Sequence, residues 1–479
     1  MFNDLREFIK EADDLGQVKV IEGADWNVEI GTITELSQCK PDQPLLLFDR
    51  IKGYPAGYRT ATNFLNNFKL IALAYGLPLE ARGLDLVKAW RERVRQDFTL
   101  LPPVEVKGGP IEENVKTGKD IDLWKFPAPK WHEFDGGRYI GTGDVVITKD
   151  PDTGCVNLGV FRIQVHDKTI ANVHIEPGRH TDVIRQKYWA KGQGCPVAVV
   201  CGEDPRLFAM AGPIAPWGVS EYDYAGWLRK KPVEVIKGKT VDLPIPAMSE
   251  IVLEGEMGPP GLDDRIEGPF GEGKGYYDGG LSEPVMKVTC VMHRNDPIIL
   301  GCPPLCGDYE LRYGMLIPMA ANIWDEIERS ITGVKGVWLM NEARNPITVV
   351  SIEQQYVGHA KEAAILANAS FTRVKVPSRF IIVVDDDIDP SNISQVMLAL
   401  GTRCNPEGAI DIVKGLRCAV SEPILSPEKK ERGDISLGRC FIYACKPYSW
   451  IKEFPRFNKR SDQLLKEASR KWGHLLFKV

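Results

Sequence analysis

The chain has 479 residues, more than one hydrophobic core organises, so we expect two or three domains. Apolar residues make up 43% and charged residues 26%, as in ordinary globular proteins, and a net charge of −5 argues against a nucleic-acid partner. No apolar run reaches the roughly 18 residues of a membrane span, and eleven cysteines without tight spacing fit a reducing cytoplasm. We therefore expect a cytoplasmic protein with no membrane span.

Residues 1–108 mix helices and strands. Apolar residues three and four apart predict a first helix, and the ranges 44–49, 63–75 and 84–98 predict a buried strand and two helices. No residue pattern in this part indicates chemistry, so we expect a domain that packs against, or covers, the rest of the chain.

Short strands dominate residues 109–305. The β-branched runs bounded by Gly, Pro or Asp are predicted as strands over 144–149, 156–165, 169–174, 197–201, 232–236, 250–255 and 285–293. A helix over 182–191 interrupts them, and the turn sequence at 150–154 predicts that the first two strands form a hairpin. This regular spacing indicates a β-barrel or a sandwich.

Helices and strands alternate over residues 306–455. Helices over 317–331, 355–369 and 393–400 and a buried strand over 380–385 predict an α/β layer. The last segment, 456–479, contains one amphipathic helix over 462–476. This helix either joins copies of the chain or docks on its own chain.

Two glutamates flank a stiff loop in the sequence I-E-G-P-F-G-E-G-K-G-Y-Y at 266–277. Glycine permits positive φ and proline fixes its own φ, so the loop can bring Glu267 and Glu272 together. Paired carboxylates can act as acid and base or bind a metal ion. An exposed turn with two ordinary surface glutamates explains the loop equally well.

A predicted strand with the sequence C-V-N-L-G-V-F-R carries polar groups in unusual places. Asn157 needs a hydrogen-bond partner if it is buried, and the planar fork of Arg162 suits a carboxylate. Gly159 between them indicates a bulge or a closely approaching ligand. An edge strand with two exposed polar residues is an equally reasonable interpretation.

Two helix starts supply further candidates. His180 ends the sequence E-P-G-R-H, and Glu221 follows Ser220 in a capping pattern. Helix capping alone accounts for either residue. If Asn157, His180 and Glu221 converge, they form a mixed oxygen and nitrogen ligand set that suits Mn²⁺ or Mg²⁺.

Taken in order along essentially the whole chain, these stretches resemble the UbiD family of reversible decarboxylases. The marks are N-x-G-x-x-R ending at Arg162, G-R-H ending at His180, S-E-Y-x-x-A-G from Ser220, and E-G-P-F-G-E from Glu267 to Glu272. The resemblance implies a mixed α/β (α+β) fold. Its parts are an N-terminal α/β domain (1–108), a central split β-barrel of the flavin-binding type (109–305), a C-terminal α/β domain (306–455) and a C-terminal helix for oligomerisation (456–479).

The resemblance also implies prenylated FMN as cofactor, supplied by a separate flavin prenyltransferase, with Mn²⁺ or Mg²⁺ at its phosphate and K⁺ nearby. The family's metal ligands carry over to Asn157, His180 and Glu221. Its catalytic residues carry over to Arg162, Glu267 and Glu272. Cofactor contacts are expected at Asn157, Gly159, Val160, Phe161, Arg162, Arg179, His180, Glu221 and Lys361.

Such enzymes need the cofactor because no protein side chain is an electron sink for the carbanion that decarboxylation leaves. The resemblance implies a covalent adduct with prenylated FMN, loss of CO₂ and protonation by Glu272. We favour an aromatic or heteroaromatic acid as substrate over an α,β-unsaturated, cinnamic-type acid, and expect a homodimer or homohexamer.

Two other functions stay open at this point. One is a cofactor-binding subunit without turnover, and the other, apart from the resemblance, is a metal-dependent hydrolase that uses Glu267 and Glu272. One residue departs from the family pattern, because Arg179 stands where many relatives have Gln. We expect Arg179 to contact either the flavin or an acidic group of the substrate.

Overall fold

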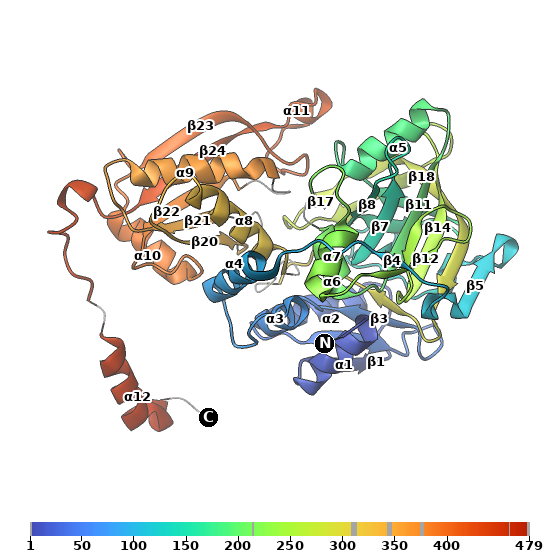
Figure 1. The fold of residues 1–479 in the computed structure, drawn as a ribbon, viewed down its shortest axis with the longest axis horizontal. Helices are drawn as coiled ribbons and strands as arrows, with labels where there is room; N and C mark the ends of the chain where they lie inside the picture. Colours follow the sequence, from blue (N-terminus) through green and yellow to red (C-terminus); the bar gives the residue numbers. More distant parts are fainter. Residues whose placement is uncertain are drawn as a thin grey trace.

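The computed structural model describes residues 2–212, 215–307, 314–342, 347–373, 378–458 and 460–476. The chain forms three parts that contain both helices and strands, followed by a C-terminal helix that projects from the body (Figure 1). The predicted mixed α/β fold is therefore confirmed. None of the helices in the described residues is long and apolar enough to cross a membrane.

The N-terminal part packs helices on a four-stranded sheet with the strand order β1-β2-β3-β19. Its elements are α1 (Leu5–Asp14), β1 (Val18–Glu22), α2 (Glu29–Ser37), β2 (Leu45–Asp49), β3 (Arg59–Thr62), α3 (Phe68–Tyr75) and α4 (Leu84–Asp97). The helix predicted over 63–75 begins only at Phe68, because the Asn67 side chain caps it by accepting from the Leu70 N–H. The fourth strand, β19 (Ile298–Leu300), comes from far along the chain and ties this part to the central one.

The described chain forms a ten-stranded central sheet, ordered β6-β9-β10-β18-β14-β11-β7-β8, with β5 and β15 also paired to β18. Its strands are β5 (Asn114–Thr117), β6 (Arg138–Gly141), β7 (Asp144–Lys149), β8 (Val156–Gly159), β9 (Arg162–Val165), β10 (Ile170–His174), β11 (Cys195–Cys201), β14 (Ile251–Met257), β15 (Asp264–Glu267) and β18 (Leu281–His293). Beside it lie α5 (His180–Ala190), α6 (Pro205–Ala211), α7 (Glu221–Arg229) and the short strands β4 (Val104–Glu105), β12 (Glu234–Lys237), β13 (Pro244–Pro246), β16 (Phe270–Gly271) and β17 (Tyr277–Asp278).

The single strand predicted over 156–165 is wrong, because this segment is two strands. β8 pairs with β7 at one end of the sheet, and β9 pairs with β6 and β10 near the other end. Only Val160 and Phe161 join them, so the Cα atoms of Gly159 and Arg162 lie three residue steps apart, which span no more than about 11 Å. The two ends of the sheet must therefore approach each other, so the sheet curls. Gly159 permits the crossing, because a Cβ there would lie 2.5 Å from the Phe161 ring.

Both faces of the curled sheet are buried. On β7, Val145 and Ile147 face the core shared with the N-terminal and C-terminal parts, whereas Val146 faces the core inside the curl. β11 divides in the same way, with Ala198 on one side and Val199 on the other. These strands read as continuous apolar runs for this reason, instead of alternating with polar residues.

The C-terminal part is a five-stranded sheet, ordered β20-β21-β22-β24-β23, with helices packed on it. Its elements are α8 (Leu316–Glu328), β20 (Val334–Met340), β21 (Ile347–Ile352), α9 (His359–Ala369), β22 (Phe380–Asp385), α10 (Ile393–Arg403), β23 (Ile410–Arg417), α11 (Pro427–Glu431) and β24 (Ser436–Ala444). The terminal helix α12 (Asp462–Leu476) has the predicted bounds.

Helices α4 and α8 join the N-terminal and C-terminal parts through charged groups. The Arg91 guanidinium is buried, donates to Asp325 at 2.7 Å and to Glu328, and lies 3.9 Å from the centre of the Trp324 ring. Removing one partner of a buried ion pair leaves the other charge without compensation.

We expect Arg91→Ala to lower the free energy of unfolding by about 2 kcal/mol, below the range for fully buried pairs because both carboxylates are partly exposed. The matched control is Arg95→Ala, since Arg95 contacts the same two carboxylates but is 58% exposed. Its removal should lower the free energy of unfolding by less than about 1 kcal/mol. Equal losses for the two variants in urea titrations would contradict this assignment.

Candidate active site

Arg162, Glu267 and Glu272 meet at the start of strand β9. Arg162 begins β9 and holds Glu267 with two parallel hydrogen bonds, from Nε at 2.8 Å and from Nη2 at 2.7 Å. Its third nitrogen, Nη1, donates to Glu272. Glu267 is fully buried and the Glu272 side chain is 26% exposed. The interpretation of this loop as an exposed turn with two surface glutamates is therefore wrong for Glu267.

The central strands hold the glutamate loop in place. The Gln164 side chain accepts a hydrogen bond from the Gly268 N–H at 2.8 Å, and Asp135 accepts one from the Gly271 N–H at 3.0 Å. Gly268 has a φ of +80°, which favours glycine at this turn. Phe270 packs on Tyr139 with ring centres 4.4 Å apart. The loop is thus a fixed part of the site, as its Gly and Pro content predicts.

The charge of Glu267 is set by its neighbours. Burial raises the pKa of this carboxyl, but hydrogen bonds and charge from Arg162, the charge of His174 and a hydrogen bond from Tyr139 together lower the pKa below its ordinary value. Tyr139 donates to Glu267 Oε1 at 3.1 Å. Glu267 is therefore ionised at neutral pH and anchors Arg162 as its counter-ion.

The same loop is tied to the C-terminal part. Lys274, two residues after Glu272, donates to Glu422 at 3.0 Å, and Arg379 donates to the other oxygen of the same carboxylate. Glu422 is buried and the Lys274 side chain is only 10% exposed. The segment that carries Glu272 thus bridges the central sheet and the C-terminal part.

Asn157, His180 and Glu221 line one pocket, so the structure brings the three candidate ligands together. They come from β8, the first residue of α5 and the first residue of α7. The pocket measures about 400 Å³ with its open mouth, which admits part of a small molecule beside an ion. Its walls are Asn157, Leu158, Gly159, Phe161, Gly178, Arg179, His180, Thr181, Ala211 and Glu221.

The donor set of this pocket fits a hard divalent cation. Burial lowers the pKa of His180, with a smaller effect from Arg179, which keeps the imidazole neutral as a metal ligand requires. Burial raises the pKa of Glu221 to about 7, partly opposed by the hydrogen bond that it accepts from the Leu158 N–H at 2.8 Å. Asn157 uses its amide N–H₂ on Thr181 at 3.0 Å, which leaves the amide oxygen to bind an ion.

Other residues predicted to contact the cofactor divide into two groups. Gly159, Phe161 and Arg179 line the pocket, and the Arg179 guanidinium lies 5.7 Å from the centre of the Phe161 ring. Val160 belongs to the two-residue crossover beside it. The structure does not bring Lys361 to this pocket. Its ammonium pairs with Asp411 of β23 at 2.9 Å, on an exposed face of the C-terminal part.

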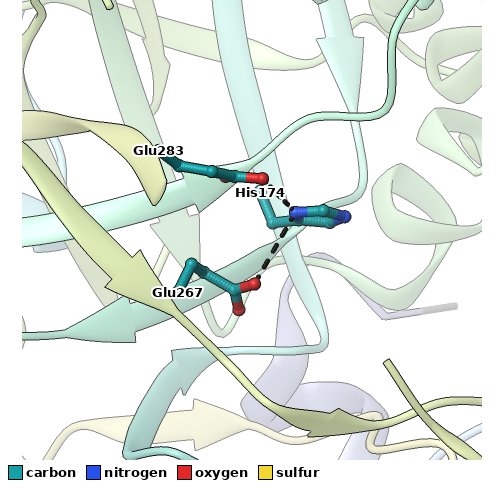
Figure 2. A group of neighbouring side chains, drawn as sticks. All are labelled: His174, Glu267 and Glu283. Atoms are coloured by element: carbon teal, nitrogen blue, oxygen red, sulfur yellow. Dashed lines mark hydrogen bonds and ion pairs between the residues drawn. The ribbon is translucent and has the colours of Figure 1, made fainter. Parts of the chain in front are cut away.

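Sequence reasoning missed His174, which lies beside the glutamates. Figure 2 shows its ring between Glu267 and Glu283, with Nδ1 2.7 Å from Glu283 Oε1 and 3.7 Å from Glu267 Oε2. The pairing of β9 with β10 places His174 directly opposite Arg162, and this register became visible only in the tertiary structure. Tyr139 was also missed, because its hydrogen bond to Glu267 depends on the pairing of strand β6 with β9.

Comparison with known proteins identifies the fold. Family models of 3-octaprenyl-4-hydroxybenzoate carboxy-lyase match the N-terminal domain over residues 9–90, the Rift-related domain over 103–305 and the C-terminal domain over 313–444. The chain is 34% identical over 468 residues to the pyrrole-2-carboxylic acid decarboxylase of Pseudomonas aeruginosa, which covers 93% of this chain and 91% of that protein.

Solved structures agree over the full length. The UbiD-class enzyme HmfF of Pelotomaculum thermopropionicum, in complex with FMN, matches with a TM-score of 0.83 at 28% identity and covers 97% of this chain and 99% of that chain. An evolved dimeric form of that enzyme in complex with prFMN matches with a TM-score of 0.80 at 27% identity. The match covers 97% of this chain and 98% of that chain. The vanillic acid decarboxylase of Sedimentibacter hydroxybenzoicus in its closed form matches at 0.81 and 28%, over 100% of both chains. The chain is therefore an enzyme of the UbiD family of prenylated-FMN-dependent carboxy-lyases.

Proposed function

We propose that this protein is a reversible, non-oxidative decarboxylase of an aromatic or heteroaromatic carboxylic acid. The observation that carries the proposal is the nearly buried Arg162 held between two carboxylates, Glu267 and Glu272, at the start of β9. Relatives named for pyrrole-2-carboxylic acid and for vanillic acid support a ring-bearing substrate. A cinnamic-type acid is the alternative substrate, and a cofactor-binding subunit without turnover is the alternative function.

Prenylated FMN, when bound, supplies the electron sink that cleavage of a carbon–CO₂ bond requires. In this chain, Asn157, His180 and Glu221 would hold Mn²⁺ or Mg²⁺ against the cofactor phosphate, and a K⁺ ion would lie nearby. We place Arg179 at the cofactor as well, because it lines the same pocket as these three residues. A flavin prenyltransferase is the expected supplier of the cofactor.

The protein's own groups would then divide the work. Arg162, fixed by ionised Glu267, orients the carboxylate of the incoming acid. Glu272 holds the proton that replaces CO₂ on the substrate carbon and recovers a proton from solvent, to which it is partly open. Addition of CO₂ would run through the same groups in reverse.

We further propose that α12 joins copies of the chain into a homodimer or homohexamer. Its large apolar side chains are exposed at Leu464, Leu465, Trp472, Leu475 and Leu476. The helix lies away from the body of the protein (Figure 1). An amphipathic helix with an open apolar face is stabilised by packing that face against another surface.

The function is tested by expressing the chain with and without a flavin prenyltransferase and following absorbance and CO₂ release over aromatic, heteroaromatic and cinnamic-type acids. We expect flavin absorbance and turnover only after co-expression.

Glu272→Gln should keep the flavin but lose turnover at least about 100-fold, because only proton return is removed. The control is Glu256→Gln, since Glu256 is exposed on β14 and should be as active as the parent. A loaded parent protein that is inert on every acid would leave only the binding-subunit alternative.

Arg179→Gln should lower the ratio of flavin to protein several-fold without changing which acid is preferred, because we place Arg179 at the cofactor. Lys191→Gln is the control, since Lys191 caps the other end of the same helix. The ratio is read from absorbance of the purified protein. Full flavin retention with an altered substrate preference would move Arg179 to the substrate instead.

Leu465→Glu with Trp472→Glu should lower the molecular mass of the assembly, because these residues lie seven apart on one face of α12. Arg470→Glu, on the opposite face, should leave the mass unchanged. Sedimentation equilibrium gives both masses. An unchanged mass for the double variant would remove α12 from the interface.

A further inference from the structure

His174 and Glu283 form a pair beside the candidate catalytic residues. Three neighbouring strands place them in one row, with Arg162 on β9 opposite His174 on β10, and β10 paired in turn with β18, which carries Glu283. His174 Nδ1 lies 2.7 Å from Glu283 Oε1 and 3.7 Å from Glu267 Oε2. Both side chains of the pair are about 15% exposed, so their charges are poorly screened by water.

The pair leaves Glu283 with few partners. Its second oxygen, Oε2, is buried and has no hydrogen-bond partner among the residues that the structure describes. A buried carboxylate held by one neighbour depends strongly on the charge of that neighbour. Figure 2 shows the far nitrogen of the His174 ring pointing away from both carboxylates, so only Nδ1 is engaged with them.

A metal ion is a poor occupant of this group. His174, Glu267 and Glu283 each place one ligand atom within 4.8 Å of the others. However, Arg162 already donates to both oxygens of Glu267, and its positive charge would repel a cation bound there. A proton on the imidazole balances the carboxylates without displacing Arg162.

The charges that face His174 show why this proton matters. Arg162 comes from β9, Glu267 from β15 and Glu283 from β18. Tyr139 of β6 donates to Glu267, and Glu272 accepts a hydrogen bond from Arg162. If Glu272 holds the proton that it donates, the charges that remain are one cation, Arg162, and two carboxylates, Glu267 and Glu283. A neutral His174 leaves this group negative, and a protonated His174 makes it neutral.

We propose that His174, held by Glu283, is a positioning residue that acts as an imidazolium and lets Arg162 receive an anionic substrate. This proposal rests on the proposed function, since it assigns the substrate a carboxylate. The surroundings agree with it. Burial and Arg162 lower the pKa of His174, but the hydrogen bond that His174 donates to Glu283 and the charges of Glu283 and Glu267 outweigh them and raise it.

The sign of the pH effect follows. Below the raised pKa, His174 is protonated and the group is balanced. As pH rises through that pKa, the imidazolium is lost and the group gains one negative charge. This negative charge repels the carboxylate of the substrate. In a partly screened site, we expect the repulsion to raise KM roughly tenfold. kcat should change much less, because His174 touches neither reacting atom.

The first measurement is an NMR titration of histidine-labelled protein without cofactor, with His174 assigned by the signal lost in His174→Gln. We expect a midpoint above the ordinary value of about 6.5 in the parent. Glu283→Gln should lower that midpoint by roughly one pH unit, and Glu256→Gln should not move it. A parent midpoint at or below the ordinary value, or one that Glu283→Gln does not move, would overturn the proposal.

The second measurement is the pH profile of KM and kcat in the cofactor-loaded enzyme. The rise in KM should begin at lower pH in Glu283→Gln and be absent in His174→Gln, whose KM should be high throughout. If either variant loses activity while the pH at which KM rises stays where it is in the parent, His174 has a purely structural role and the proposal is refuted. If no acid is turned over, the proposed function fails, and the NMR titration still decides the state of His174.

A third measurement, with the same NMR signal, tests whether the group binds a metal ion. Zn²⁺ is added to His180→Ala, which lacks the imidazole of the other candidate site. We expect no shift of the His174 signal at one equivalent of Zn²⁺. A shift that is complete at one equivalent would mean that the group binds a metal ion and that His174 does not act as an imidazolium.

Discussion

The site depends on one guanidinium that faces two carboxylates. Arg162 can be buried only because Glu267 takes two of its hydrogen bonds as an ionised partner, and the third nitrogen then points at Glu272. A buried ion pair with excellent geometry is favourable, whereas either charge alone would be strongly destabilising. Arg162, Glu267 and Glu272 therefore fix one another, and the glutamate loop and strand β9 are held in register around them.

The curl of the central sheet brings the candidate catalytic residue Arg162 close to the candidate metal ligand Asn157. β8 and β9 belong to opposite ends of the strand order, yet two residues connect them, so Asn157 and Arg162 lie at the line where the ends approach. The candidate metal ligands come from β8 and from the starts of α5 and α7, and the arginine comes from β9. One short crossover thus sets the spacing between Arg162 and the pocket that Asn157 lines.

The glutamate loop also couples the central and C-terminal parts of the molecule. Glu272 contacts Arg162 on the central sheet, and Lys274 contacts Glu422 of the C-terminal part. A displacement of the C-terminal part would therefore act on the segment that carries Glu272. Glu422 is buried and accepts from both Lys274 and Arg379, so this contact links the loop to one defined position of the C-terminal part.

The sequence by itself determined most elements of the fold, since Gly and Pro punctuation and apolar runs are local signals. It indicated Asn157, Arg162, His180, Glu221 and the two loop glutamates, and the strand over 380–385. Only the tertiary structure decided that the segment 156–165 is two strands, that Glu267 is buried, that Lys361 lies with Asp411, and that His174 joins the glutamates. The physical reason is that strand pairing joins residues distant in sequence, and a side chain's charge partners follow from that pairing.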